Sequence, residues 1–234
     1  MADANLSKSE RESLKAIYRM GHNGREAHTG ALAEALKVSP ATMTATVKKL
    51  AERGLVDHKL YRGVELTASG QQAATAAIRR HRIVERFLAD TLGYAWNEAD
   101  RLACTFEHEL PQQVEDRLYA ALDRPTSCPH GFPIPGPEVG DIPTLPPLYD
   151  LEAGDVAVVA VPSWVDPDIV VYLGTLGVRP GVKVEVLEKH PFEGPLVLRV
   201  DGEARMLSAM VARQIYVKKD EPAEGRDTTG RNVE

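Results

Sequence analysis

The segment SPATMTATVKKLAERG at residues 39–54 predicts one helix together with its start and end signals. Ser39 is a typical N-cap, and Pro40 suits the first helical position, where a backbone N–H has no partner in any case. Gly54 predicts the end of the helix. Small hydroxyl residues lie along the face expected to be exposed, at Thr42, Thr44 and Thr46. Such a face would let the helix lie deep in a DNA major groove.

The segments on both sides of this helix complete the pattern of a winged helix-turn-helix. Residues 7–20 predict a helix that begins with a capping box formed by Ser7 and Glu10. A short second helix is expected to start at Thr29. Residues 55–66, LVDHKLYRGVEL, predict two short strands joined by a Tyr-Arg-Gly turn. This order of helices and hairpin is typical of a DNA-binding domain, although a three-helix module that never meets DNA is the alternative.

Positive charge is concentrated in the same part of the chain. The formal net charge of the 234 residues is −6, yet residues 1–80 carry +5 and the remainder carries −11. A basic head on an acidic body indicates that only the head meets a polyanion. The residues expected to contact double-stranded DNA are Thr29, Ser39, Pro40, Thr42, Thr44, Lys48, Lys49 and, at the tip of the wing, Arg62.

After the head, the sequence pattern changes twice. Residues 67–92 and 96–109 predict two helices, and Pro111 begins a third. A helical segment of this size commonly pairs two DNA-reading heads. Residues 125–148 hold eight of the 16 prolines and predict an extended tether. Five β-rich runs follow, namely VAVVAV, IVVYL, VKVEVL, LVLRV and IYVKK, and they predict a small barrel.

Side chains that commonly bind metal ions gather on the first two of these helices. They are His81 and Glu85 on the first helix and Asp100, Cys104, Glu107 and His108 on the second. Their spacing places each set on one face of its helix. Solvated ion pairs and a core cysteine are the alternative, but burying Glu107 and His108 without compensation would cost on the order of several kcal/mol. A bound cation is one compensation, and Glu12 on the first helix of the head could join it.

Several of these segments together resemble the diphtheria toxin repressor family of metal-dependent transcriptional regulators, which are manganese- or iron-dependent repressors. The resemblance is carried by SPATMTATVKKLAERGL, RHRIVERFLADTLG, CTFEHELPQQVEDRL, CPHG at residues 128–131 and PIPG at residues 133–136. With the patterns above, it implies a fold that is mainly α with a small β domain. The expected parts are a winged helix-turn-helix (1–72), a helical metal-binding and dimerisation domain (73–124), a proline-rich tether (125–148), an SH3-like, FeoA-like β-barrel (149–218) and a disordered tail (219–234).

The resemblance implies two metal sites in each subunit. One would use His81, Glu85 and Asp100, and the other would use Glu12, Cys104, Glu107 and His108. In the family the barrel can donate oxygen ligands to the first site, for which Asp166 and Asp168 are the candidates here, with a plain Asp-Pro turn as the alternative. Cys128 and His130 are interpreted as part of a structural turn rather than as ligands.

Two positions bear on the choice of metal. Iron-responsive members of the family generally carry Met and His where this chain has Glu12 and Asp100. Both differences put a hard carboxylate in place of a softer ligand, and oxygen-rich sites suit Mn²⁺. Cys104 points instead toward Fe²⁺ or a later metal. We therefore expect Mn²⁺ as the cofactor, with Fe²⁺ as the alternative.

The function that the resemblance implies is metal-dependent repression of manganese or iron uptake genes by a homodimer on a palindromic operator. Without metal, the clustered carboxylates would repel one another and leave the heads mobile, and metal would fix each head. A winged-helix transcription factor that responds to a non-metal signal is the alternative.

Other classes of protein are disfavoured. No apolar run approaches the ~18 residues of a membrane span, the N-terminus lacks a secretion signal and the two cysteines fit a reducing compartment, so a cytoplasmic protein without a membrane partner is expected. A hydrolase built on Cys104 and His108 would lack an oxyanion hole, so no enzymatic activity is expected. A barrel that reads proline-rich peptides would have few aromatic residues to line its groove.

Overall fold

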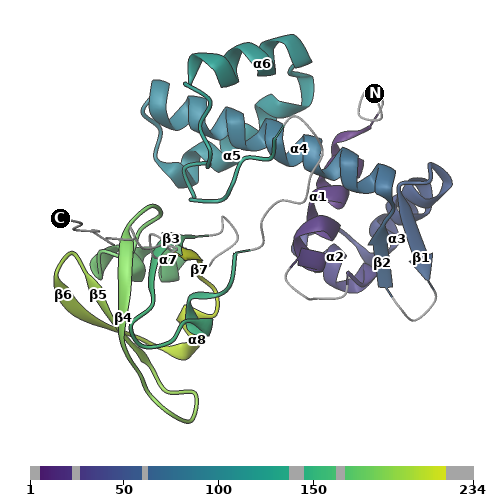
Figure 1. Cartoon of the computed structure of the whole chain (residues 1–234). Helices are drawn as coiled ribbons and strands as arrows, with labels where there is room; N and C mark the ends of the chain where they lie inside the picture. Colours follow the sequence, from purple (N-terminus) through teal and green to yellow (C-terminus); the bar gives the residue numbers. More distant parts are fainter. Residues whose placement is uncertain (1–5, 23–26, 60–62, 137–144, 162–166, 220–234) are drawn as a thin grey trace, which may run out of the picture. The chain divides into compact units, whose positions relative to one another are not determined.

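The computed structural model describes residues 6–22, 27–59, 63–136, 145–161 and 167–219. The chain folds into two compact units, residues 1–144 and 145–234 (Figure 1). Arg62 at the expected wing tip, Asp166, and all but the first residue of the expected disordered tail lie outside the described residues. Within the described part, no helix combines the length and the apolar character needed to cross a membrane.

The first unit begins with the expected winged helix-turn-helix. Its elements are α1 (Lys8–His22), α2 (Thr29–Ala35), α3 (Pro40–Glu52), β1 (Val56–Lys59) and β2 (Gly63–Leu66), and the two strands are antiparallel. Both predicted helix starts are confirmed. Ser7 and Glu10 exchange hydrogen bonds at the start of α1, and the Ser39 hydroxyl accepts from the Thr42 N–H at the start of α3.

The core of the head corrects one expectation about α3. Val47 and Leu50 lie three residues apart and are buried in the core of the head. Thr46, four residues before Leu50, is on the same face, and its hydroxyl donates to the Thr42 carbonyl at 3.0 Å. Thr46 is only 7% exposed, so the expectation that it belongs to the exposed face is wrong, whereas Thr42 and Thr44 are exposed.

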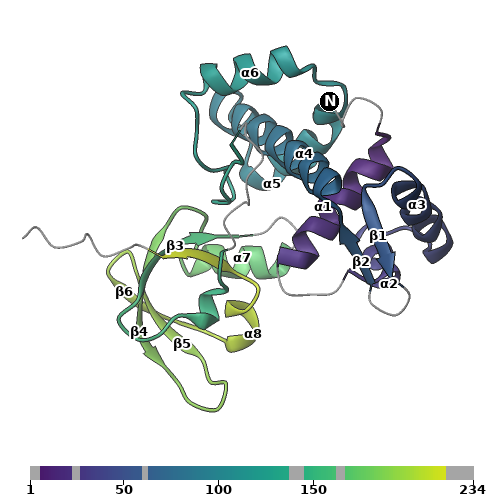
Figure 2. The same cartoon turned by 45° about the vertical axis from the view of Figure 1, so that its right-hand side comes forward.

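One long helix, α4 (Ala68–Arg86), connects the head to the rest of the first unit (Figures 1 and 2). It packs against α1, α5 and α6. The remaining elements are η1 (Phe87–Thr91), α5 (Trp96–Phe106), η2 (Glu107–Glu109) and α6 (Gln112–Ala121). η1 is a π-helix and η2 is a 3-10 helix, so each of the two predicted helices changes geometry near its end. A 3-10 helix has about three residues per turn, so the side chains of η2 are spaced differently from those of α5.

The second unit is built on a five-stranded antiparallel sheet in the order β6-β5-β4-β3-β7. Its elements are η3 (Leu148–Asp150), β3 (Val156–Ala160), α7 (Pro167–Thr175), β4 (Lys183–Lys189), β5 (Leu196–Val200), β6 (Glu203–Leu207), α8 (Ala209–Ala212) and β7 (Tyr216–Lys219). The predicted small β domain is confirmed, but the strand expected from IVVYL is wrong, because these residues lie in α7. Pro167 at the start of α7 and Asp168 in its first turn favour a helix there. The sequence did not predict β6, which follows β5 across a turn where Asp201 and Gly202 have positive φ.

Gly70, in the first turn of α4, tests how closely this helix packs on the head. A Cβ at this position would lie 1.8 Å from the Leu55 carbonyl oxygen. We predict that Gly70→Ala lowers the free energy of unfolding by about 3 kcal/mol or more, because backbone must move. The matched control is Gly30→Ala in α2, where a Cβ would meet nothing within 4 Å. Helix propensity should raise the stability of that variant by up to about 1 kcal/mol. Urea unfolding followed by far-UV circular dichroism measures both, and equal stability of the two variants would contradict the packing.

Candidate metal centre

The first group of possible metal ligands joins the head to the helical part of the first unit. Glu12 comes from α1, and Glu107 and His108 come from η2. One ligand atom of each lies within 4.8 Å of the others. His108 Nε2 is 3.9 Å from Glu12 Oε1 and 4.0 Å from Glu107 Oε1. Arg11 Nη1, also from α1, donates to the His108 carbonyl at 2.8 Å. We call Glu12, Glu107 and His108 the head cluster.

A buried ammonium group lies against the head cluster. Lys15 Nζ is 2.8 Å from Glu12 Oε1 and 2.6 Å from Glu107 Oε1, and the lysine is 1% exposed. Burial would lower the pKa of Lys15, but the charges of Glu107 and Glu12 raise it above its usual value. The expectation that these carboxylates simply repel one another without metal is corrected here, because Lys15 compensates part of their charge.

A second group of possible ligands lies on α4 and α5. His81 and Glu85 are four residues apart on α4, and Asp100 belongs to α5. His81 Nε2 is 3.1 Å from Asp100 Oδ1 and 3.6 Å from Glu85 Oε1. The structure thus brings together the three residues that the family resemblance grouped as one site, and we call them the helix cluster.

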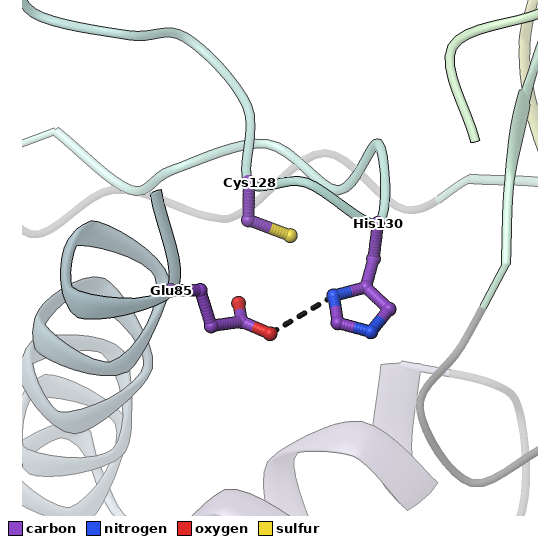
Figure 3. Close-up of side chains that lie close together, drawn as sticks. All are labelled: Glu85, Cys128 and His130. Atoms are coloured by element: carbon purple, nitrogen blue, oxygen red, sulfur yellow. Dashed lines mark ion pairs between the residues drawn. The ribbon is translucent and has the colours of Figure 1, made fainter. Parts of the chain in front are cut away.

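A third group uses residues that the sequence had assigned to a structural turn. That turn exists, since the Gly131 N–H donates to the Cys128 carbonyl at 2.9 Å. The side chains of Cys128 and His130 nevertheless lie next to Glu85 (Figure 3), and all three are buried. His130 Nδ1 is 2.9 Å from Glu85 Oε1. We call Glu85, Cys128 and His130 the turn cluster. The Cys-Pro-His spacing was the available signal, but two residues alone did not separate a ligand pair from a turn.

Side chains of the helical part hold the turn cluster in place. Arg79 donates to the Pro135 carbonyl and Arg82 donates to the Pro133 carbonyl. Trp96 of α5 contacts the His130 ring edge-on, with the ring centroids 4.9 Å apart. The beginning of the expected tether is therefore fixed to α4, which positions the thiol and the imidazole.

The three clusters form one continuous polar row because they share partners. Glu85 belongs to two of them, and His81 Nδ1 reaches Glu107 Oε2 at 2.7 Å. Burial would lower the pKa of His81, but Glu85, Asp100 and Glu107 raise it well above its usual value. Burial would raise the pKa values of Glu85 and Glu107, but His81 lowers both, helped by His130 at Glu85 and by Lys15 at Glu107. Without metal, Glu85, Asp100 and Glu107 are therefore ionised and paired with cationic side chains.

Two expected ligands belong to none of these clusters. Among the described residues, Cys104 is in none of the groups of closely spaced ligand atoms, although its thiol faces His81 of the helix cluster and helps to raise the pKa of that imidazole. Asp168 is an exposed residue in the first turn of α7 of the second unit, and its role as a ligand stays a prediction.

The side chains of the clusters fit a divalent cation. Both ring nitrogens of His108 and Nε2 of His130 are buried and have no hydrogen-bond partner among the described residues. A buried polar atom without a partner costs free energy, which coordination would recover. Carboxylates and imidazoles are common ligands of first-row divalent metals, and a thiol extends the range to softer ones.

The candidate DNA-binding surface is on α3. The expected contact residues that are exposed there are Ser39, Pro40, Thr42, Thr44, Lys48 and Lys49. The Thr44 hydroxyl donates to the Pro40 carbonyl at 2.8 Å, which leaves its methyl group for apolar contacts. Thr29 is the first residue of α2. The surface therefore offers hydroxyl, methyl and ammonium groups, which are the kinds that meet base edges and phosphates.

Comparison with known protein families matches three consecutive parts of the chain. Residues 5–64 match the N-terminal DNA binding domain of iron dependent repressors, residues 67–136 match their metal binding and dimerisation domain, and residues 147–219 match the FeoA domain. The iron-dependent repressor IdeR of Mycobacterium tuberculosis is 34% identical over 219 residues, covering 88% of this chain and 95% of that protein. The diphtheria toxin repressor of Corynebacterium efficiens is 30% identical over 217 residues, covering 88% and 93%.

Solved structures agree with these matches. A manganese-dependent transcriptional repressor in complex with manganese shares 34% identity with a TM-score of 0.75, covering 89% of this chain and 99% of that one. The manganese regulator SloR shares 28% identity with a TM-score of 0.76, covering 90% and 98%.

The fold and these likenesses define a metal-dependent regulator with a DNA-binding head and a dimerisation domain, and not an enzyme. The chain belongs to the family of the diphtheria toxin repressor and IdeR, the iron- or manganese-dependent transcriptional repressors. The expected family, the expected fold class and the absence of an enzymatic function in this family are confirmed.

Metal binding at the turn cluster should depend on pH. Burial would lower the pKa of His130, but hydrogen bonds with Cys128 and Glu85 raise it to about 9. A protonated imidazole cannot act as a ligand, so a cation that binds at pH 7 must displace a proton, and its affinity rises with pH up to that pKa. We predict that the affinity for Zn²⁺, a softer cation that suits a thiol and an imidazole, increases between about pH 6.5 and about pH 8.5 and that His130→Gln reduces the slope.

Isothermal titration calorimetry in two buffers of different ionisation enthalpy counts the protons released in this experiment. Wild-type affinity that is independent of pH, with no proton released on binding, would show that His130 is not a ligand.

Proposed function

We propose that this protein represses metal-uptake genes when Mn²⁺ is bound, with Fe²⁺ as the second choice of metal. The proposal rests on one observation, namely that the residues of the head cluster come from two different parts of the first unit. Glu12 belongs to α1 of the DNA-binding head, whereas Glu107 and His108 belong to the helical part. A divalent cation bound by all three would supply positive charge between the two parts and hold them in one arrangement.

The donor atoms support the preference for Mn²⁺. The head cluster offers two carboxylates and one imidazole, and Cys104 is not among its closely spaced ligand atoms. Asp100 adds a third carboxylate in the helix cluster. Oxygen-rich donor sets suit Mn²⁺, whereas the Cys128 thiol of the turn cluster suits a softer metal. The head cluster is therefore proposed as the site that responds to Mn²⁺.

The geometry of α1 explains how a cation would act on DNA binding. α1 contacts α3 through the ion pair of Glu10 with Arg53 at 3.2 Å and through the hydroxyls of Ser9 and Thr46 at 3.5 Å. Fixing α1 therefore fixes α3, on which the expected DNA contacts lie. In a homodimer, two recognition helices would then match the half-sites of a palindromic operator. By linkage, DNA and metal each raise the affinity for the other by the same factor.

We predict that Mn²⁺ raises operator affinity by about tenfold or more. Operator duplexes would first be selected from a random pool with Mn²⁺ present, and their dissociation constants then measured by fluorescence anisotropy with Mn²⁺, with Fe²⁺ under anaerobic conditions, and with a chelator. Equal affinity with and without metal would reject metal-dependent binding, and a larger effect of Fe²⁺ would reverse the order of metals.

The same assay tests the head cluster through one pair of variants. Glu12→Ala should fold and bind DNA weakly in every condition, because α1 loses its ligand. Glu34→Ala removes an exposed carboxylate of α2 and serves as the control. Equal metal dependence of the two variants would remove Glu12 from the mechanism.

Exposed apolar side chains mark the surface that we propose for the homodimer. Leu92, Tyr94, Phe106 and Val114, all in the helical part of the first unit, are 54%, 43%, 58% and 42% exposed. Large apolar patches on a folded protein commonly form interfaces. We predict that Leu92→Glu combined with Phe106→Glu yields a monomer by light scattering coupled to size-exclusion chromatography. Val171→Glu, at an exposed position of α7, should leave the dimer intact, and a dimeric double variant would place the interface elsewhere.

A further inference from the structure

Lys15 is a buried charged residue for which the proposed function has no role. Its side chain projects from α1 and is 1% exposed, although lysine is almost never fully buried unless it is paired. Its two partners are the carboxylates of Glu12 and Glu107. Among the described residues, the ion pairs that replace the lost water of this ammonium group are made within the head cluster.

The oxygen atoms that Lys15 contacts are the atoms offered to a metal ion. Lys15 Nζ lies 2.8 Å from Glu12 Oε1 and 2.6 Å from Glu107 Oε1. The same two oxygens lie 3.9 Å and 4.0 Å from His108 Nε2, the third ligand atom. That nitrogen is buried without a hydrogen-bond partner among the described residues. The ammonium group therefore hydrogen-bonds Glu107 Oε1 and forms an ion pair with Glu12 Oε1, whereas His108 Nε2 has no hydrogen-bond partner among the described residues.

The charges of the cluster do not allow both cations to stay. The two carboxylates face one ammonium group at 2.8 Å and 2.6 Å. A divalent cation on the same oxygens would lie a few ångströms from the ammonium group in a poorly solvated site, where like charges repel strongly.

We propose that Lys15 is a built-in competitor for the cation position of the head cluster, so that a metal ion must displace its ammonium group and Lys15 sets the metal concentration at which the repressor responds. The inference rests on the proposed role of the head cluster as a metal site. Lys15 would thus determine the affinity of the head cluster for metal, and this role requires no contact between Lys15 and DNA.

The surroundings of Glu107 allow this exchange. Glu107 Oε2 contacts His81 Nδ1 at 2.7 Å. The carboxylate therefore keeps His81 as a partner when Oε1 exchanges the Lys15 ammonium group for a metal ion. Arg11 Nη1 still ties α1 to the His108 carbonyl at 2.8 Å. The displaced side chain begins on the same helix as Glu12, one turn away, so its departure requires rotation of the lysine side chain and no unfolding of α1.

A purely structural lysine predicts the opposite behaviour. If Lys15 held α1 to η2 in both states, its removal would weaken the fold and the metal site together. If Lys15 competes with the metal, its removal takes the ammonium partner from Glu12 and leaves Glu107 with His81 alone, which destabilises the metal-free protein and favours the cation. The sign of the change in metal affinity therefore distinguishes the two roles.

The first experiment measures Mn²⁺ affinity of the full-length chain by competition with a fluorescent chelator, with the number of bound ions counted by electron paramagnetic resonance. Lys15→Met should bind Mn²⁺ at least about tenfold more tightly than wild type, at unchanged stoichiometry, and should melt at a lower temperature without metal. Lys8→Met, at an exposed position of the same helix, should stay within about twofold of wild type. Affinity that is unchanged or weaker in Lys15→Met overturns the competition.

The second experiment uses the wild-type protein. Its outcome therefore does not depend on whether a variant with a substituted buried residue still folds. Acetylation by a brief pulse of reagent, read by peptide mass spectrometry, reports whether the Lys15 amine is accessible. We expect little labelling of Lys15 without metal and at least about fivefold more with saturating Mn²⁺, because a displaced amine reaches solvent. Saturation with Mn²⁺ without any increase in labelling overturns the displacement.

One further variant distinguishes a failure of the competition by Lys15 from a failure of the proposed metal site. Glu12→Gln should weaken Mn²⁺ binding if the head cluster is a metal site. Unchanged binding in Glu12→Gln rejects the site and the competition together. Weakened binding in Glu12→Gln, with no gain in Lys15→Met, rejects the competition alone.

Discussion

One buried carboxylate, Glu107, connects the part of the protein that reads DNA with the part that is expected to sense metal. Its Oε1 contacts Lys15 of α1 at 2.6 Å, and its Oε2 contacts His81 of α4 at 2.7 Å. Removal of the carboxylate would leave Lys15 with Glu12 alone and His81 with Glu85 and Asp100. Because breaking one buried ion pair typically costs about 3–5 kcal/mol, this change would destabilise the protein. The position of α1, and of α3 which packs on it, therefore depends on the charges that surround Glu107.

An apolar core could have joined these helices with greater stability. Well-packed hydrophobic residues often stabilise a fold more than a buried ion pair of similar volume. The protein instead places a row of carboxylates and imidazoles there, from the head cluster through His81 to Glu85 and His130. Such a row can respond to a cation, because a charge that enters at one end changes the pairing of every group that shares a partner. The polar interior is thus explained by a sensing function.

Sequence signals that involve neighbouring residues correctly predicted helix starts and residues that share one face of a helix. The capping residues Ser7 and Ser39 placed two helix starts correctly, and the i,i+4 pair of His81 and Glu85 shares a face as expected. Contacts between distant segments were not predictable. Lys15 and Glu107 are 92 residues apart, and no helical pattern distinguishes a buried lysine from a solvated one. The turn cluster was missed for the same reason, since Cys128 and His130 become candidate ligands only through their approach to α4.

Anomalous diffraction from crystals of the manganese-loaded protein, recorded on both sides of the manganese absorption edge, tests most directly whether a cation joins α1 to the helical part. The arrangement described here predicts a manganese peak at bonding distance from Glu12, Glu107 and His108, with the Lys15 side chain turned away from both carboxylates. A map in which manganese occupies other positions, while Lys15 still bridges Glu12 and Glu107, would contradict it.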